Sequence, residues 1–461
     1  MSVYLPTELL TSNDVRNLKK DLLVKETPAG NKFISPVYQT NLKAVECYDD
    51  YVIDETEYSV IPFSYYKKKF FQNEEENKYP IRDTECKTVE TLQFKGELLD
   101  RQKEVKKEVV KILNETNSVV LSLHTGFGKT VMALYFCCKI GLRTIVLCHR
   151  KIIIEQWITS IEKYIPNATF CILGDKPTKK YMREHPQYTD EKDADILVCN
   201  VINVPKRKRE FYKEFGTVII DEIHTVCTES FSKSLLYLFP EYIIGLSATP
   251  FRSDGMDRII DLFCGSNIIF RKLYKPFNAY RFNTGITLDI KENISGQMDW
   301  NSVLESQVES DKRNDMIVKL CLYFCTKNIL ILVKRVDHAI RLKQLLINKG
   351  EIVDTFMDTK KTFNEDCRIL IATFSKGGVG FDFPKLNMLI CGGDVKENFA
   401  QYIGRIFRRD DVNPIYIDLV DEMKTIKTHS TERMKFCKEI GAEVKPFQKT
   451  FKDFEFWSQY L

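Results

Sequence analysis

The stretch Thr125-Gly126-Phe127-Gly128-Lys129-Thr130 decides the fold class of this chain. An apolar run over residues 119–123 precedes it, and a helical pattern begins at Lys129. Glycines let main-chain N–H groups wrap a phosphate, and the N-terminus of the following helix adds positive potential. The lysine of such a loop reaches the β- and γ-phosphates, and the hydroxyl after it binds Mg²⁺. The stretch therefore predicts a nucleotide-binding loop, which taken alone fits kinases and GTPases equally well.

Short apolar segments alternate with helical patterns on both sides of this loop. We expect strands at residues 119–123, 144–148, 196–199, 217–220, 242–246, 329–333, 368–373, 387–390 and 415–419. We expect helices at residues 101–113, from 129 onward, at 336–349 and at 398–407. Such alternation indicates parallel sheets covered by helices on both faces. The predicted fold class is α/β, with two lobes in tandem.

The length of 461 residues suits two or three domains rather than one core. The expected parts are a small β-rich or mixed N-terminal accessory domain, a first lobe, a linker, a second lobe and a C-terminal tail. Their expected boundaries are 1–90, 91–275, 276–310, 311–440 and 441–461.

Composition places the chain among ordinary globular proteins, with 44% hydrophobic and 29% charged residues. No apolar run approaches the roughly 20 residues of a membrane-spanning helix, and the N-terminus lacks a secretory pattern. The 14 cysteines form no Cys-x-x-Cys pair, so we expect reduced, buried thiols inside a cell. The net charge of +4 does not indicate which class of partner the chain binds.

A second motif follows the expected strand at 217–220 and reads Asp221-Glu222-Ile223-His224. Asp221 at the strand tip is placed to hold Mg²⁺, and Glu222 to activate the attacking water. A third motif, Ser247-Ala248-Thr249-Pro250, closes another apolar strand. Its hydroxyl groups can hydrogen-bond the acidic motif and relay the nucleotide state.

A fourth motif lies in the second lobe and runs from Gln401 to Arg408 as Gln-Tyr-Ile-Gly-Arg-Ile-Phe-Arg. Helical spacing predicts that Gln401, Arg405 and Arg408 share one face. A guanidinium group is a rigid, permanent charge that can stabilise a transferring phosphoryl group. We predict that all three residues are catalytic.

These motifs, in this order, resemble those of superfamily-2 helicases of the DExH type, over residues 96–421. The resemblance implies two RecA-like lobes that bind ATP and Mg²⁺ in the cleft between them. It assigns Gln102 to the adenine edge, residues 125–130 to the phosphates, and Thr130 and Asp221 to Mg²⁺. Gly380 and Asp382 match the motif that touches ribose and nucleic acid, and Arg405 and Arg408 match the finger arginines.

Finer features are similar to the XPB-like branch. They are the run Thr249-Pro250-Phe251-Arg252-Ser253-Asp254-Gly255, the segment Phe94–Gly96, His149-Arg150 and Gln156-Trp157. Ser253 departs from the glutamate that is usual there. The length and the single N-terminal domain resemble helicases of large nucleocytoplasmic DNA viruses, of the poxvirus transcript-release and iridovirus types. For a viral chain we expect the host cytoplasm, the host nucleus or the virion.

A motor that tracks a backbone contacts phosphates through basic, hydroxyl and main-chain groups. By position at strand ends, the candidates are Arg150, Asn200, Thr373 and Lys376. The basic run 206–209 fits a solvated patch better than a nuclear-import signal or a DNA contact. The run Tyr65–Phe71 interleaves aromatic residues and lysines, which fits a stacking groove or a strand with inward rings equally.

We therefore predict an ATP-hydrolysing helicase or translocase that acts as a monomer, contacts no membrane and cooperates with transcription or replication machinery. DNA is the favoured substrate, with RNA or a hybrid as alternatives. One rival is a duplex translocase that displaces protein or RNA without separating strands. The other is a nucleic-acid-binding adaptor with a dead ATPase core, against which Lys129, Glu222 and Arg408 argue.

Overall fold

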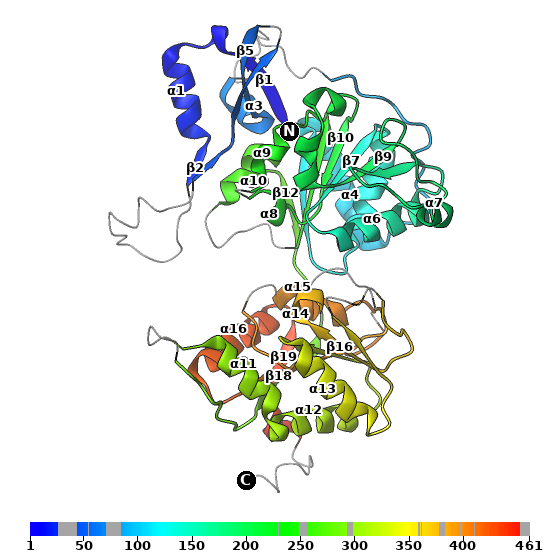
Figure 1. Ribbon diagram of the computed structural model, residues 1–461, viewed down its shortest axis with the longest axis vertical. Coiled ribbons are helices and arrows are strands. Elements are labelled where there is room, and N and C mark those ends of the chain that lie inside the picture. The colour runs from blue at the N-terminus through cyan, green and yellow to red at the C-terminus, as the bar shows by residue number, and fades with distance from the viewer. Residues whose placement is uncertain are drawn as a thin grey trace. The chain divides into compact units, whose positions relative to one another are not determined.

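The computed structural model describes residues 1–25, 44–53, 55–70, 84–228, 230–248, 256–292, 298–357, 360, 362–377, 383–396, 399–409 and 411–451. The chain forms two compact units, Met1–Arg271 and Lys272–Leu461 (Figure 1). Each unit contains a seven-stranded sheet flanked by helices, which confirms the predicted pair of α/β lobes.

The sheet of the first unit has the strand order β12-β6-β11-β10-β7-β9-β8, and every pairing is parallel. All six residues of β6 and all five of β7 are buried, as expected for a sheet covered on both faces. The strands are β6 Ser118–Leu123, β7 Thr144–Cys148, β8 Phe170–Ile172, β9 Ile196–Asn200, β10 Thr217–Ile220, β11 Tyr242–Ser247 and β12 Ile268–Arg271. The helices are α4 Asp100–Thr116, α5 Lys129–Ile140, α6 Lys151–Tyr164, α7 Lys179–Glu184, α8 Ile223–Val226, α9 Ser232–Leu235 and α10 Asp257–Cys264.

The N-terminal residues form a mixed α and β structure that shares the core of the first unit. Its elements are β1 Ser2–Pro6, α1 Ser12–Asp21, β2 Leu23–Lys25, β3 Ala44–Glu46, β4 Asp49–Ile53, β5 Thr56–Pro62 and α3 Phe63–Phe70. Strands β1, β5 and β4 pair in an antiparallel sheet. Apolar side chains of this part and of the large sheet belong to one hydrophobic cluster, so the boundary expected near residue 90 does not separate two cores.

The two arginines of the basic run at 206–209 form ion pairs within the first unit, whereas Lys206 and Lys208 are exposed. Arg209 is only 3% exposed, pairs with Asp49 at 2.5 Å and lies over the rings of Tyr51 and Tyr237. Arg207 donates two hydrogen bonds of 2.8 Å to Glu191. The predicted solvated patch is therefore wrong for Arg209, which is buried and joins segments 160 residues apart, whereas Arg207 stays partly exposed.

The aromatic and basic run at 65–70 forms helix α3 rather than a strand. Tyr65 and Tyr66 are buried, and Lys69 and Lys68 pair with Asp21 and Asp261. These two rings therefore pack inward, as one of the two alternatives predicted, but they do so from a helix and not from a strand. Phe71 lies outside the described residues.

The sheet of the second unit has the order β15-β16-β14-β17-β18-β13-β19, again with parallel pairs throughout. Its strands are β13 Phe277–Asn283, β14 Ile329–Val333, β15 Val353–Phe356, β16 Ile369–Thr373, β17 Met388–Cys391, β18 Ile415–Val420 and β19 Ala442–Pro446. Its helices are α11 Trp300–Glu309, α12 Asp311–Tyr323, α13 Val336–Ile347, α14 Phe374–Gly377, α15 Phe399–Ile403, α16 Lys424–Glu439 and α17 Phe447–Thr450.

Two expected connecting segments belong to this second unit. The expected linker at 276–310 contains β13, which pairs with β18 on one side and β19 on the other, and helix α11. The expected tail at 441–461 contributes β19 and the buried ring of Phe447. Polar residues such as Asn278 and Arg281 interrupt the apolar pattern of β13, and so its sequence is similar to that of a loop.

All 14 cysteines are free thiols, and most are buried, as the sequence predicts. Burial raises the pKa of Cys47, Cys137, Cys321 and Cys391 to about 12. These thiols therefore stay protonated near neutral pH and behave as small apolar groups. Among the described residues, no helix has the length and apolar character needed to cross a membrane.

Stability of the second unit should depend on the pH through His338, which is 2% exposed and contacts Asn314 Oδ1 at 2.9 Å. Burial, assisted by the charge of Arg313, lowers the pKa of His338 to about 3. Between pH 6.5 and 3 the unfolded chain binds a proton that the folded chain rejects, so the free energy of unfolding falls as the pH drops. We expect a loss of about 2 kcal/mol from this group at pH 5.

Chemical denaturation of the wild type and His338→Gln at pH 7 and pH 5 measures this contribution. The glutamine can keep the contact with Asn314 but cannot be protonated. Its unfolding free energy should therefore fall less between the two pH values. An equal loss in both proteins would contradict a buried neutral histidine.

Candidate nucleotide and nucleic-acid site

The predicted phosphate-binding loop, called the phosphate loop below, follows β6 and leads directly into α5. Gly126 and Gly128 have φ values of 86° and 94°, in the left-handed region that favours glycine. Lys129 is the first residue of α5, and its ammonium group donates to the carbonyl of Leu123 at 3.1 Å. Thr130 lies in the same first helical turn. The structure therefore places these side chains beside the main-chain N–H groups that open a twelve-residue helix.

Gly128 is the glycine on which this geometry depends most. A Cβ atom there would lie 2.4 Å from Nε2 of Gln102, and the φ of +94° would strain any other residue. We expect Gly128→Ala to reduce ATP affinity by about tenfold or more, because a shift of about 1 Å in a positioning loop is costly. Gly141 ends the same helix at φ +71° with open space around it, so Gly141→Ala is the control for backbone strain alone. Equal affinity in the wild type and Gly128→Ala, measured with a fluorescent ATP analogue, would contradict this role.

Gln102 is 3% exposed and holds the loop by its side-chain amide. Its Oε1 accepts the N–H of Leu99 at 2.9 Å, and its Nε2 donates to the carbonyl of Phe127 at 2.9 Å. Both ends of the amide therefore bind the main chain here. The adenine-reading role remains a prediction that would require the amide to change partners.

The acidic motif lies at the carboxyl end of β10, with β11 between β10 and β6. Carboxyl ends of parallel strands share one sheet edge, so the motif and the phosphate loop lie on the same edge. Asp221 accepts hydrogen bonds from the indole of Trp157 at 2.9 Å and from the N–H of Glu222 at 3.0 Å. Burial and the charge of Glu222 raise the pKa of Asp221 to about 6, whereas Lys129 lowers it. Lys129 and Asp221 thus lie at the same sheet edge, close enough to interact electrostatically.

The residues present fit a magnesium ion. Two adjacent carboxylates share a partly buried site, and positive charge there would favour the ionised form of Asp221. Mg²⁺ commonly uses one or two carboxylates, and waters and substrate phosphates fill its other positions. No cluster of three or more His, Cys, Asp or Glu side chains able to hold a metal occurs in the described part of the chain.

Glu222 has two features of a reactive group. Its φ of 46° is unusual for a residue other than glycine, and such strain is concentrated at functional sites. Its Oε2 atom is buried and accepts no hydrogen bond from the described residues, although Nδ1 of His224 lies 3.5 Å away. An unsatisfied carboxylate oxygen beside the phosphate loop can accept a proton from water.

The motif at the end of β11 contacts the acidic motif, as expected. Nδ1 of His224 lies 3.0 Å from Oγ of Ser247. Thr225 Oγ1 lies 3.0 Å from Nδ1 of His149, and burial lowers the pKa of that histidine to about 4. Polar contacts therefore join the segment that follows β10 to the carboxyl ends of β11 and β7.

Trp157 is a site residue whose role the sequence analysis missed. Its ring is buried within α6, and its indole N–H fixes the orientation of Asp221. In the sequence, Trp157 stands out only as part of the run His149-Arg150 and Gln156-Trp157. The spacing of these residues does not indicate a contact with a residue 64 positions away.

The arginine motif of the second unit differs from the single helix expected over 398–407. Helix α15 ends at Ile403, and a tighter turn follows over Gly404–Ile406. Gln401 and Arg405 are buried, and Nε of Arg405 donates to the carbonyl of Gly377 at 3.1 Å. Arg408 follows the turn and is partly exposed. The prediction that these three side chains share one face of a single helix is therefore wrong. The change of helix type at Gly404 alters the direction of the later side chains.

The candidate nucleic-acid residues differ in exposure. Arg150 is exposed and Asn200 partly exposed, whereas Thr373 is buried and bonds Ser375 at 3.0 Å. Lys376 is partly exposed and lies over the ring of Phe356. A hollow of about 170 Å³ adjoins Asn200, and its lining includes Lys151 and the Gly174 loop.

Gly380, Asp382 and the run 249–255, which carries the XPB-like signature, lie outside the described residues. Their predicted roles remain predictions.

The two seven-stranded parallel sheets, the phosphate loop and the Asp-Glu pair define a helicase-type ATPase. Residues 95–252 match the family model "Type III restriction enzyme, res subunit". "Putative helicase 161L" of Invertebrate iridescent virus 6 is 37% identical over 421 residues, which is 86% of this chain and 91% of that protein. "Putative helicase 055L" of Frog virus 3 is 28% identical, over 76% of this chain and 79% of its own. The chain therefore belongs to this family of viral superfamily-2 helicases.

Solved structures support the fold. Dbp5 of S. cerevisiae, bound to RNA and ADP with BeF3, has a TM-score of 0.53 at 15% identity, and the likeness covers 80% of this chain and 99% of that one. At that identity the likeness concerns the fold alone.

Proposed function

We propose that this chain uses ATP hydrolysis to move along DNA and separate or remodel its strands. The observation that supports the proposal most directly is the convergence of Lys129, Asp221 and Glu222 at one edge of the first sheet. A loop that only held a nucleotide would not need a strained carboxylate with a buried, unsatisfied oxygen beside it.

In this proposal Lys129 and the N–H groups of residues 125–130 bind the phosphates of ATP. Thr130 and Asp221 would hold Mg²⁺, which when bound would supply positive charge to the phosphoryl group. Glu222 orients the attacking water and accepts its proton. Arg405 and Arg408 would supply positive charge to the transition state.

Nucleic acid would bind through its phosphates, since a motor must tolerate every sequence. Exposed Arg150 and the hollow beside Asn200 support this role in the first unit, and Lys376 supports it in the second. Buried Thr373 would act through Ser375, which is exposed and bonded to it.

A strand-displacement assay and a translocation assay, run on the same protein with ATP, test the proposal. We expect displacement of a labelled DNA strand and movement along the remaining one, both abolished when Lys129 is replaced by alanine. Movement without strand separation would favour the duplex translocase, and absence of both would overturn the motor.

A further inference from the structure

The segment Gly392–Val395 of the second unit connects β17 to the part of the chain that carries the arginine motif. Helix α15 begins at Phe399, and Arg405 and Arg408 follow within nine residues of that point. This loop therefore lies shortly before the arginine motif in the chain.

Arg313 holds the first residue of the loop. Arg313 is 0% exposed, and its Nε donates to Asp421 at 3.0 Å and 3.1 Å, while its Nη1 donates to the carbonyl of Gly392 at 2.9 Å. Asp421, also 0% exposed, accepts further hydrogen bonds from Thr284 and Gln307, each of 2.8 Å.

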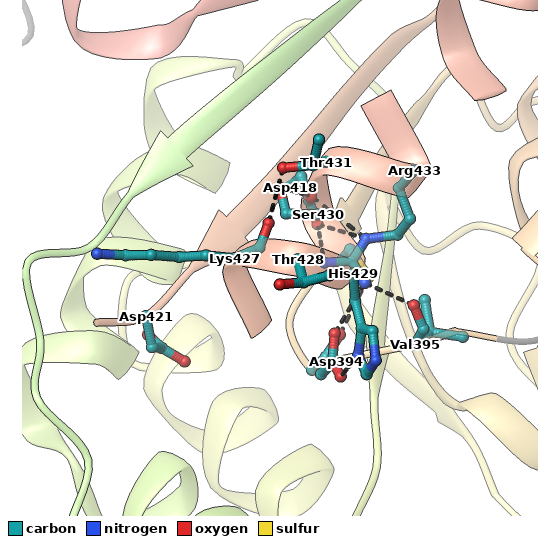
Figure 2. A network of polar contacts seen from close by, with 12 residues as sticks. Asp394, Val395, Asp418, Asp421, Lys427, Thr428, His429, Ser430, Thr431 and Arg433 are labelled. Carbon is teal, nitrogen blue, oxygen red and sulfur yellow. Dashed lines mark hydrogen bonds and ion pairs between the residues drawn. The ribbon is translucent and has the colours of Figure 1, made fainter. Parts of the chain in front are cut away.

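Arg433 of α16 holds the last residues of the loop. Figure 2 shows its guanidinium group between Asp394, Val395 and Asp418. Nη1 donates to Asp394 at 2.8 Å and to the carbonyl of Val395 at 2.5 Å, and Nε donates to Asp418 at 3.1 Å. Ser430 donates to Asp418 at 2.6 Å, so the buried carboxylate is further satisfied.

The loop and the arginine motif are also in contact through one ring. A Cβ on Gly393 would lie 3.3 Å from the ring of Phe374, and that ring packs against Tyr402 of α15 with centroids 5.1 Å apart. Phe374 begins α14, and Gly377 at its end accepts the hydrogen bond from Arg405. A shift of the loop would therefore reach the arginine motif through the packing around Phe374.

Buried ion pairs are a costly way to gain stability, because desolvation offsets most of their attraction. Here two of them reach main-chain carbonyls at opposite ends of the same four-residue loop. We propose that Arg313 and Arg433 are positioning residues that fix this loop, and through it Arg405 and Arg408, for ATP hydrolysis. The inference rests on the proposed function, since it assumes that these arginines act on the transferring phosphoryl group.

Arg313→Lys and Arg433→Lys test the inference, because lysine keeps the charge but cannot bridge a carboxylate and a carbonyl in the same way. We expect each variant to lower kcat for ATP about 10- to 100-fold, as a misplacement near 1 Å can do. The KM for ATP should stay within about twofold, because the phosphate loop lies in the other unit.

Arg368→Lys is the matched control. Arg368 also combines an acidic partner, Glu351 at 2.7 Å, with carbonyl contacts to Lys327 and Cys321. It directly precedes β16 and so lies at the amino ends of the strands, whereas the loop at 392–395 follows the carboxyl end of β17. Its loss should lower the melting temperature with kcat unchanged. Equal effects of Arg368→Lys and Arg433→Lys on kcat would overturn the inference.

A double variant separates positioning from general damage. If Arg433 acts through Arg408, the Arg433→Lys change should reduce kcat no further in an Arg408→Ala background, within about twofold. Multiplied losses would overturn the inference. If Arg408→Ala alone retains normal turnover, the proposed role of the arginine motif fails instead.

If Arg313→Lys or Arg433→Lys does not fold, variants that remove a single hydrogen bond to the same carboxylates test the inference instead. Thr284→Val removes one hydrogen bond to Asp421, and Ser430→Ala removes one to Asp418. A measurable loss of kcat at constant KM is expected for both, and kcat equal to that of the wild type in both would contradict the inference.

Discussion

Replacing Arg408 with alanine should lower nucleic-acid-stimulated ATP hydrolysis by a factor on the order of 10³–10⁵, with ATP binding preserved. Arg408 follows the tight turn that ends the buried arginine motif and is partly exposed, whereas Arg405 is buried against Gly377. Of the two, Arg408 is therefore better placed to leave its present surroundings for a phosphate. The measurement is steady-state phosphate release, together with equilibrium binding of an ATP analogue.

Arg409→Ala is the matched control for this change. Arg409 is the next residue, is exposed and pairs with Asp411. An exposed pair of this kind contributes little, so its loss should leave turnover within about twofold. Normal hydrolysis in Arg408→Ala would show that the arginine assignment is wrong.

Glu222→Gln should lower hydrolysis by about 10²–10⁴, because glutamine keeps the shape of the side chain but cannot accept a proton. The variant should still bind ATP, since the phosphate contacts come from residues 125–130. Single-turnover measurements with bound ATP separate the chemical step from binding and release.

Glu214→Gln is the control for Glu222→Gln. Glu214 lies shortly before β10, the strand whose far end carries the acidic motif, and it pairs with Arg143 and Lys87. Removing its charge should leave turnover unchanged. Full activity in Glu222→Gln would refute its role in activating water.

The sequence predicts most of the first unit's site, because that chemistry depends on local patterns. The phosphate loop, Asp221-Glu222 and Ser247 all follow apolar strands and therefore meet at one sheet edge. The contact of Trp157 with Asp221 and the main-chain bonds of Gln102 could not be predicted, since each depends on how a helix packs against a distant loop.

The second unit was harder to predict for physical reasons. Strand β13 carries polar residues among apolar ones, and its pairing with β18 and β19 involves chain segments more than 130 residues away. Gly404 directly follows the end of α15 at Ile403, but a single glycine is also tolerated inside a helical pattern and so does not fix where the helix ends. Arg313, Asp421 and Arg433 are charged residues at buried positions, where pattern analysis expects apolar side chains.

The most direct test of the account is the rate of ATP hydrolysis with single-stranded DNA, duplex DNA and RNA measured side by side and compared with no polymer. We expect hydrolysis to rise strongly with nucleic acid, most with DNA, and to be lost in Lys129→Ala under every condition. A rate that is the same with and without every polymer, or that survives the loss of Lys129, would contradict an ATP-driven nucleic-acid motor.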